Sequence, residues 1–261
     1  MSDVLEQILE SRRKSLEKSK IRRSIRDLEG MILGVPAPLD FKNAINRPGE
    51  ISVIAEMKKK SPSAGMIRPE YSVSKIAEAY KKGGARALSV LTEEDFFGGE
   101  ILDLQRAKDA SELPILRKDF IFDPYQIAEA RAYGADAILL IADMLDPGHL
   151  NDLVDCALEY RVEPLVEVFT PSVLEAVLQT KARIVGINNR NLRTLEMLPD
   201  NVENLSRLIP SDRVVVAESG IKKPEEISAL RKLPVRAVLV GESLLKQPDL
   251  EVAVRKLVEA A

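Results

Sequence analysis

Short apolar segments alternate with longer amphipathic segments over most of the chain. The apolar segments are rich in Val, Ile and Leu and are bounded by Gly, Pro or charged residues, which is typical of buried parallel strands. We predict eight strands, centred on residues 53–55, 87–91, 114–116, 137–141, 165–168, 184–187, 214–217 and 237–240. The segments between and after them have helical periodicity and predict eight helices, at residues 73–82, 101–110, 125–133, 150–160, 173–179, 201–208, 224–232 and 250–259.

Strict alternation of strands and helices predicts an α/β protein whose parallel sheet closes into a (β/α)8 TIM barrel. The length of 261 residues agrees with the roughly 250 residues typical of that fold. Gly-Ala pairs at residues 84–85 and 134–135 stand where a helix would end and turn into the next strand. An open doubly wound sheet is the alternative, but no G-x-G-x-x-G motif follows the first strand.

Residues 1–48, ahead of the first strand, predict an N-terminal helical extension of a single barrel domain that spans residues 1–261. The extension begins with a highly charged helix, from residue 4 to about residue 28, whose apolar face carries Leu5, Ile8, Leu9 and Leu16. Gly and Pro residues then break the chain, and Asp40 caps a short helix at residues 41–45.

Three basic residues, Arg22, Arg23 and Arg26, lie near the end of this long helix. Basic residues on a helix mostly form a solvated face. No strand follows this helix directly, so its end is also free to reach over the mouth of the barrel. We therefore expect the three arginines either to face solvent or to overhang an anionic ligand.

The composition limits the classes of partner. Hydrophobic residues make up 45% of the chain and charged residues 30%, as in a soluble globular protein. The net charge of -3 gives no basic footprint for nucleic acid, and no apolar run approaches the ~20 residues of a membrane span. Cys156, the single cysteine, cannot form a disulfide within the chain, and the N-terminus lacks the apolar core of a signal peptide. We expect a cytoplasmic protein with neither nucleic-acid nor membrane partners.

We expect neither a metal site nor a cofactor. His149, the single histidine, follows Asp-Pro-Gly near a predicted helix start, which is typical of a surface or capping residue. The carboxylates have no metal-ligand spacing. Cys156 lies within a predicted outer helix, which argues against a thiol nucleophile. Helix faces alone do not distinguish a monomer from a homodimer, and we expect a monomer with a homodimer as the alternative.

The first predicted strand ends in charged residues, Glu56 and Lys58, followed by a Ser61-Pro-Ser loop. Side chains alternate between the faces of a strand, so these two charged groups share a face with Ile54. The segment is either a catalytic strand that delivers a carboxylate and an ammonium to one site, or a buried strand that runs into a solvated basic loop.

Other predicted strands also end in polar residues, and in a barrel the C-terminal ends of the strands meet at one rim. These residues are Ser89, Lys118, Glu167, Asn188, Arg190, Glu218, Ser219 and Glu242. Structural ion pairs across the rim are the alternative to an active site. Burial of several charges costs several kcal/mol per ion unless they are well paired, which favours a functional role.

Two glycines, Gly220 and Gly241, follow the seventh and eighth strands. Barrels commonly bind phosphate at these loops through backbone N–H groups. Turns need glycine for other reasons too, but two glycines in these particular loops favour a phosphate site. We expect a small phosphorylated substrate.

Together these segments resemble the indole-3-glycerol phosphate synthase family over every strand end and the N-terminal extension. The motifs are Ile-Ala-Glu56-Met-Lys58-Lys-Lys-Ser61-Pro-Ser, Leu-Arg-Lys118-Asp-Phe120, Gly134-Ala-Asp-Ala-Ile-Leu-Leu-Ile, Leu-Val-Glu167-Val, Gly-Ile-Asn188-Asn-Arg190-Asn-Leu192 and Glu218-Ser219-Gly220-Ile. Two positions depart from the family pattern: Phe169, where His usually follows Val-Glu-Val, and Gly99, where we expect Ser.

The resemblance implies a lyase of tryptophan biosynthesis. It closes the ring of 1-(2-carboxyphenylamino)-1-deoxyribulose 5-phosphate and releases indole-3-glycerol phosphate, CO2 and water without a cofactor. Lys118 is implied as the general acid on the ribulose carbonyl, and Glu167 as the acid/base in the dehydration. Lys58 either pairs with the substrate carboxylate or shares the acid role. The implied positioning residues are Glu56, Asn188, Glu218 and Ser219.

The resemblance also implies the substrate-binding residues. The substrate anions would be held by Ser61, Arg190 and the backbone at Gly220, Gly241 and Glu242. The aromatic ring would be bound by Phe97, Phe120, Leu139 and Leu192, with Ser89 and Leu239 completing the set. Two other functions remain open: a Schiff-base aldolase that uses Lys118 as nucleophile, and an inactive barrel that binds a phosphorylated ligand.

Overall fold

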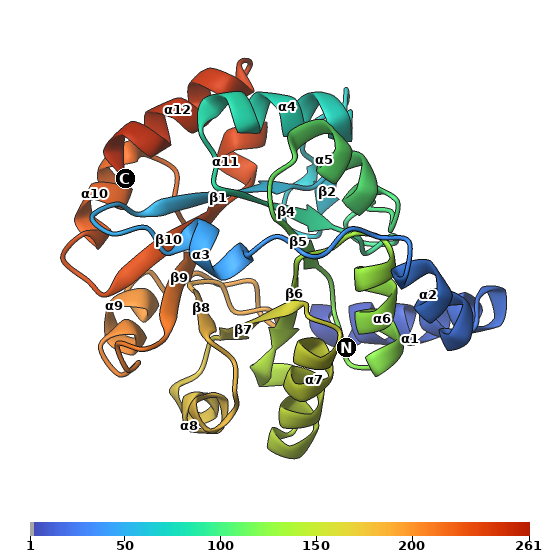
Figure 1. Cartoon of the computed structure of the whole chain (residues 1–261). Coiled ribbons are helices and arrows are strands. Elements are labelled where there is room, and N and C mark those ends of the chain that lie inside the picture. Colours follow the sequence, from blue (N-terminus) through green and yellow to red (C-terminus); the bar gives the residue numbers. More distant parts are fainter. Residues whose placement is uncertain (1–2) are drawn as a thin grey trace.

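The computed structural model describes residues 3–261 and contains a closed barrel of eight parallel strands (Figure 1). Each strand pairs with the next along the chain, and β1 pairs with β10 to close the barrel. The predicted (β/α)8 barrel is therefore confirmed. The barrel strands are β1 (Ser52–Met57), β4 (Ala87–Leu91), β5 (Ile115–Lys118), β6 (Ala137–Ile141), β7 (Glu163–Val168), β8 (Ile184–Asn188), β9 (Val214–Glu218) and β10 (Val235–Val240).

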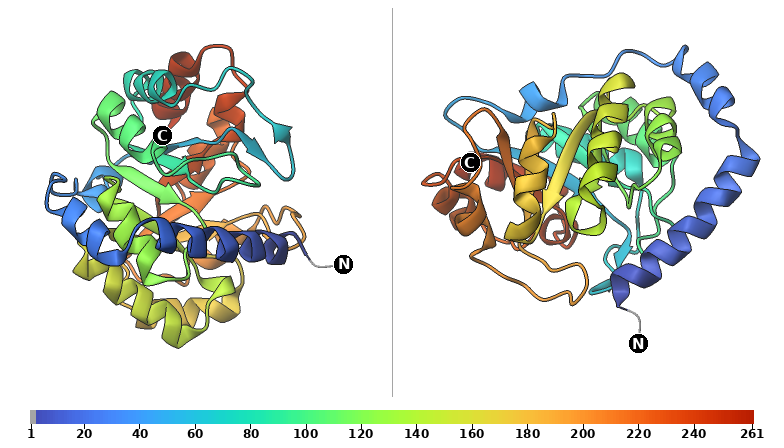
Figure 2. Two further views of the ribbon diagram at one scale, coloured as in Figure 1. Left: turned by 90° about the vertical axis from the view of Figure 1, so that its right-hand side faces the viewer. Right: turned by 90° about the horizontal axis from the view of Figure 1, so that it is seen from below.

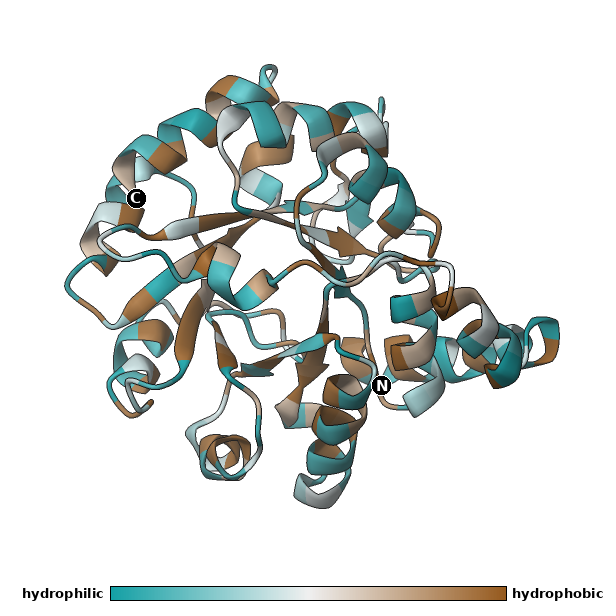
Figure 3. Ribbon diagram, viewed as in Figure 1, coloured by the Kyte–Doolittle hydropathy of each residue, from teal (hydrophilic) through white to brown (hydrophobic). Residues whose placement is uncertain are grey.

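Helices form a ring around the barrel, with apolar residues toward the strands and polar residues outward (Figures 1 and 3). Each predicted helix is present, with bounds shifted by a few residues. The helices of the ring are α4 (Val73–Gly83), α5 (Asp103–Ser111), α6 (Pro124–Ala132), α7 (Pro147–Glu159), α8 (Pro171–Gln179), α9 (Asn201–Ser206), α10 (Pro224–Leu230) and α12 (Leu250–Ala260). Three short elements were not predicted: the β2 (Lys60–Ser61) and β3 (Gly65–Met66) hairpin, the 3-10 helix η1 (Ala142–Met144) and helix α11 (Glu242–Leu245).

The interior of the barrel is filled by apolar side chains that point inward from the strands. They form one buried cluster that includes Ile54, Leu116, Leu165, Ile184, Val216 and Leu239. Helix α3 (Phe41–Ile45), capped by Asp40 as predicted, lies across the end at which the strands begin (Figure 1). Phe41 and Ile45 belong to the interior cluster, so α3 closes that end with apolar side chains.

The N-terminal extension contains two helices where we predicted one. Helix α1 (Val4–Arg22) ends before Ser24, and α2 (Ile25–Ile32) begins directly after it. Ser24 and Asp27 form a capping box, in which each side chain accepts the backbone N–H of the other. This Ser-x-x-Asp signal starts a new helix inside the charged segment, and the chain changes direction there (Figure 2).

The change of direction contradicts one expectation about the three arginines. Arg23 lies over the ring of Tyr133, 5.7 Å from its centroid, and donates to the Tyr133 hydroxyl at the end of α6. Neither Arg22, Arg23 nor Arg26 lines the cavity at the strand ends. The alternative that they overhang an anionic ligand is therefore wrong. The opposite end of α1 reaches the cavity, through Val4 and Ile8.

No helix within residues 3–261 is both long enough and apolar enough to span a membrane.

Truncation of an apolar side chain of α3, which closes one end of the barrel, should destabilise the fold. Phe41 is 1% exposed, and Phe41→Ala should lower the free energy of unfolding by about 3–5 kcal/mol, because it leaves a cavity in the barrel interior. Leu33→Ala is the control, since Leu33 is 90% exposed and its change should stay within about 0.5 kcal/mol. Urea unfolding of the three proteins measures both values. Equal midpoints would show that α3 does not close the barrel.

Candidate active site

A cavity of about 1010 Å³ opens at the C-terminal ends of the strands. Every candidate site residue from the sequence lines it, except Ser89. The lining includes Glu56, Lys58, Ser61, Phe97, Lys118, Phe120, Leu139, Glu167, Asn188, Arg190, Leu192, Glu218, Ser219, Gly220, Leu239, Gly241 and Glu242. Ser89 is fully buried inside β4 below the cavity, and its hydroxyl has no hydrogen-bond partner among residues 3–261.

Lys118 is the centre of the charged groups at the floor of this cavity. Its Nζ donates to Glu167 Oε2 at 3.0 Å and also donates to Glu218 Oε2. Glu167 Oε1 accepts a further hydrogen bond from Asn188 Nδ2 at 3.0 Å. The side chains come from the ends of β5, β7, β8 and β9, where each faces into the barrel. The barrel thus places one ammonium between two carboxylates.

These contacts fix the charge state of the lysine. Burial alone would lower the pKa of Lys118, but the attraction of Glu167, Glu218 and Glu56 outweighs burial and raises that pKa. Lys118 is therefore an ammonium group over the physiological pH range. An ammonium can donate a hydrogen bond or a proton to a substrate oxygen, but it cannot attack a carbonyl as a nucleophile.

The two carboxylates have different pKa values. Burial raises the pKa of Glu218 to about 8, with repulsion from Glu167 adding to the effect. Burial also acts on Glu167, but Lys118 and Asn188 outweigh it and lower the pKa of that carboxyl. Glu218 Oε1 accepts no hydrogen bond within residues 3–261, which makes it the favourable atom for the proton. Within this pair the shifts favour a proton on Glu218 and the negative charge on Glu167.

Gly186, in the middle of β8, makes room for this arrangement. A Cβ atom at position 186 would lie 2.2 Å from Glu218 Oε1 and 2.8 Å from Leu165 Cδ2. Any side chain there would displace the Glu218 carboxyl. The sequence analysis did not select Gly186, although a glycine inside a predicted strand is a known signal for a close approach.

Glu56 and Lys58 form a second ion pair on the β1 side of the cavity. Lys58 Nζ donates to Glu56 Oε1 at 2.6 Å. A Cβ atom at position 241 would lie 2.5 Å from that same oxygen, so Gly241 leaves space for the Glu56 carboxylate. Lys58 is the more exposed partner, with 18% of its side chain accessible against 5% for Glu56. The ammonium of Lys58 is thus placed for contact with a bound anion.

Aromatic and aliphatic side chains form a further part of the cavity wall. The rings of Phe97 and Phe120 lie 6.0 Å apart at an angle of 38°, and Leu139 and Leu192 line the same cavity. The loop that carries Phe97 is held by Glu93, whose carboxylate accepts the backbone N–H groups of Asp95, Phe96 and Phe97 at 2.8–3.1 Å. Glu93 was not selected from the sequence.

The loops after β8 and β9 approach each other at the rim. Ser219 and Gly220 have φ angles of 64° and 91°, an unusual conformation for the serine. Asn189 Nδ2 donates to the Ser219 carbonyl at 3.2 Å and stabilises this turn. Lys246, Lys58 and Arg190 all lower the pKa of Glu242, which shows that positive charges gather on this side of the cavity. Ser61 lies in the neighbouring hairpin, 7% exposed.

Position 99 has no space for the expected serine. A Cβ atom on Gly99 would lie 2.1 Å from the carbonyl oxygen of Leu91, so the backbone excludes any side chain there. At the second position that departs from the family pattern, the backbone N–H of Phe169 donates to Asp143 Oδ2 at 2.7 Å, and the Phe169 side chain does not line the cavity.

Within residues 3–261, no group of three or more His, Cys, Asp or Glu side chains forms a metal-binding arrangement.

Comparisons with known proteins point to one family. A family model described as indole-3-glycerol phosphate synthase matches residues 5–257. A protein of that name from Dechloromonas aromatica (strain RCB) is 45% identical over 237 residues, which cover 88% of this chain and 89% of the relative. A second, from Rhodopirellula baltica, is 42% identical over 228 residues, which cover 87% and 88% of the two chains.

Solved structures share the fold at low sequence identity. A tryptophan synthase subunit alpha from Legionella pneumophila aligns with a TM-score of 0.60 and 13% identity, over 84% of this chain and 97% of that chain. A thiamine phosphate pyrophosphorylase from Pyrococcus furiosus aligns with a TM-score of 0.60 and 14% identity, over 80% and 94%. At these identities the likeness extends to the fold alone.

The raised pKa of Glu218 makes a prediction about stability. Between its ordinary value of 4.5 and about 8, the folded protein holds a proton that the unfolded chain has lost. The free energy of unfolding should therefore fall as the pH rises across this window, and this decline should end above about pH 8. Urea unfolding of wild type and Glu218→Gln at several pH values isolates the effect, because the glutamine cannot titrate. A constant difference between the two proteins from pH 5 to pH 8 would contradict it.

Proposed function

The chain belongs to the indole-3-glycerol phosphate synthase family, and we propose how its rim residues perform the reaction of that family. The protein is a carboxy-lyase of tryptophan biosynthesis. It converts 1-(2-carboxyphenylamino)-1-deoxyribulose 5-phosphate to indole-3-glycerol phosphate, CO2 and water. The observation that carries the assignment of roles is the hydrogen bond of Lys118 to Glu167, 3.0 Å long, beside an aromatic wall.

Lys118 acts as the general acid in ring closure. As the ring carbon attacks the ribulose carbonyl, negative charge develops on the carbonyl oxygen. An ammonium beside that oxygen stabilises the charge and then donates its proton. The raised pKa of Lys118 does not prevent this transfer, because an alkoxide is a much stronger base than an amine.

Glu167 acts in the final dehydration. After CO2 leaves, the new hydroxyl must depart as water and a proton must be removed from the ring system. Glu167 is ionised and hydrogen-bonded to Lys118, so it can accept that proton and pass it to the neutral amine that ring closure leaves on Lys118. The restored ammonium then donates a proton to the departing hydroxyl, which leaves as water. Asn188 orients the carboxylate from its other oxygen. Glu218 stays protonated and limits the negative charge around the lysine.

The remaining residues bind the substrate. Phe97, Phe120, Leu139, Leu192 and Leu239 surround the aromatic ring. The substrate carboxylate binds through an ion pair with Lys58. Its loss as CO2 is favoured when it moves from that ion pair into the apolar neighbourhood of the phenylalanines. Ser61, Arg190 and the backbone at Ser219, Gly220, Gly241 and Glu242 hold the phosphate, next to the positive charges that lower the pKa of Glu242.

The two alternative functions are weaker on physical grounds. A Schiff-base aldolase needs a neutral amine, and the carboxylates keep Lys118 charged. Borohydride with substrate tests this, because only the aldolase would form a trapped adduct. An inactive barrel would not be expected to retain Glu56, Lys58, Lys118 and Glu167 within one cavity. Incubation with substrate, followed by indole absorbance, measures turnover directly.

Four further features complete the proposal. The chain acts as one barrel domain with residues 1–48 as its extension, in the cytoplasm, without a cofactor, and as a monomer rather than a homodimer. Loss of turnover in EDTA that a divalent ion restores would contradict the cofactor-free reaction. Light scattering of the purified protein distinguishes the monomer from the homodimer.

Lys118→Ala and Glu167→Gln should block different steps. Loss of a general acid or base usually costs about 10²–10⁴-fold in rate, so both variants should lose at least that much kcat with smaller changes in KM. Glu167→Gln should accumulate an undehydrated intermediate, whereas Lys118→Ala should accumulate none because it blocks ring closure. Quenched-flow analysis with circular dichroism as the folding control measures both. If both variants stopped at the same species, the assignment of roles would be wrong.

Removal of the substrate phosphate should reduce kcat/KM strongly. Binding energy from a remote group supports the orientation that the reacting carbon and Lys118 need. The dephosphorylated substrate should therefore lose at least about 10²-fold in kcat/KM. Arg190→Ala should reduce kcat/KM for the phosphorylated substrate more than for the dephosphorylated one. Equal effects of Arg190→Ala on both substrates would place the phosphate elsewhere.

A further inference from the structure

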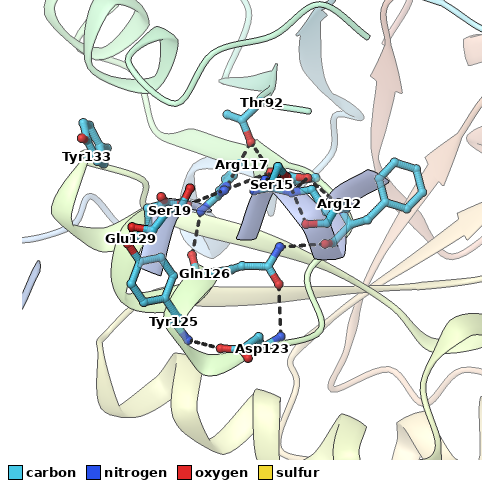
Figure 4. Close-up of polar contacts among 12 residues, drawn as sticks. Arg12, Ser15, Ser19, Thr92, Arg117, Asp123, Tyr125, Gln126, Glu129 and Tyr133 are labelled. Carbon is cyan, nitrogen blue, oxygen red and sulfur yellow. Dashed lines mark hydrogen bonds and ion pairs between the residues drawn. The ribbon is translucent and has the colours of Figure 1, made fainter. Parts of the chain in front are cut away.

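A buried ion network lies directly beside the active site, on the outer face of β5. Arg117 is completely buried between β5 and α6, a position that apolar side chains fill on most barrel strands. Its Nη2 donates to Asp119 Oδ2 and to Glu129 Oε2, each at 2.9 Å. Its Nη1 donates to the Gln126 carbonyl at 2.7 Å, and its Nε to Thr92 Oγ1 at 3.0 Å (Figure 4).

Helix α1 completes this network with Arg12, which is 6% exposed. Arg12 Nε and Nη2 donate to the two carboxylate oxygens of Asp119 at 3.0 and 2.9 Å, a bidentate pair. Thr92 Oγ1 donates to Asp119 at 2.6 Å, and the Phe120 N–H donates at 2.8 Å. Burial alone would raise the pKa of Asp119, but Arg12 and Arg117 outweigh burial and lower it to about 2.

The network contacts the chain on both sides of the general acid. Arg117 and Asp119 are the two neighbours of Lys118. Arg117 lies on the outer face of β5, whereas Lys118 points into the barrel. Asp119 follows the end of the strand, where it pairs with Arg117 at the edge of the cavity. The Thr92 N–H also donates to the Lys118 carbonyl at 3.2 Å. Two guanidinium groups and two carboxylates balance in charge, so every member is paired. Removal of Arg12 leaves the network with one uncompensated negative charge.

We propose that Arg12 is a positioning residue, which fixes the backbone at Lys118 through Asp119 and thereby places the ammonium group for catalysis. This inference rests on the role proposed for Lys118. A displacement of about 1 Å at a reacting group can cost 10²-fold in rate. The N-terminal extension thus acts on the chemical step through one buried guanidinium. Packing of α1 alone would need only an apolar side chain at this position, as at Ile8 and Leu16 on the same face.

Leu16 provides the matched control for Arg12. It lies one helical turn after Arg12 on the same face of α1, and it packs with Leu28, Tyr125 and Ala128. Leu16→Ala weakens the attachment of α1 without a change in the ion network. Arg12→Met keeps much of the side-chain volume and removes the charge. Arg12→Lys keeps the charge but cannot make the bidentate pair.

Arg12→Met should lower kcat by about 10–100-fold while KM changes by less than about threefold, because the lysine is displaced but the substrate site is retained. Arg12→Lys should show a loss of kcat between those of wild type and Arg12→Met. If Arg12→Met does not fold, the test relies on Arg12→Lys. Leu16→Ala should lower Tm to a similar extent and leave kcat within about twofold of wild type. Unchanged kcat in both Arg12 variants would overturn the proposal, as would an equal kcat loss in Leu16→Ala.

A double-mutant cycle with Lys118→Ala tests the path of the effect. If Arg12 acts through Lys118, Arg12→Met should change the residual kcat of Lys118→Ala by less than about twofold. The same large loss in both backgrounds would show that Arg12 acts by another route. Normal kcat in Lys118→Ala alone would contradict the proposed role of Lys118 and therefore this inference. A strong loss in Lys118→Ala with unchanged kcat in the Arg12 variants would contradict this inference alone.

Discussion

The ion cluster around Lys118 constrains the rest of the barrel mouth. One ammonium and two carboxylates lie together in a buried position, where unpaired charges would cost several kcal/mol each. The cluster meets this cost through one proton on Glu218 and through a hydrogen bond from Asn188 to Glu167. It also requires glycine at position 186, because any side chain there would collide with the Glu218 carboxyl. Catalytic function therefore depends on residues whose role is to hold the charged groups in place.

The fold could be predicted from sequence because its physical signals are local and repeated. Each buried strand reads as a short apolar run, and each outer helix shows helical periodicity. The barrel rim followed from the same pattern, since parallel strands place their C-terminal ends together. The errors arose where a local signal was overlooked. The capping box at Ser24 and Asp27 divides a charged segment that otherwise has continuous helical character.

The site was predicted less completely for a different reason. Residues that point into the barrel from strand ends, such as Lys118 and Glu167, are marked by strand alternation. Residues that support them come from elsewhere in the sequence and have no such marker. Arg12 interrupts an apolar stripe, yet nothing within α1 identifies Asp119, 107 residues away, as its partner. The close approach of Gly241 to Glu56 likewise depends on a pairing between the first and last strands.

The closure of the barrel by β1 and β10 has a consequence for synthesis of the chain. β1 is the first barrel strand to emerge from the ribosome, but one of its two neighbours, β10, is the last barrel strand to be made. Until then the backbone N–H and C=O groups along one edge of β1 have no partner strand, and helix α4 lacks helix α12, which packs against it. The pairing joins distant parts of the sequence, which slows folding. The nascent protein therefore cannot assemble the β1 half of its active site until β10 has been synthesised, and it must avoid edge-to-edge aggregation during that interval.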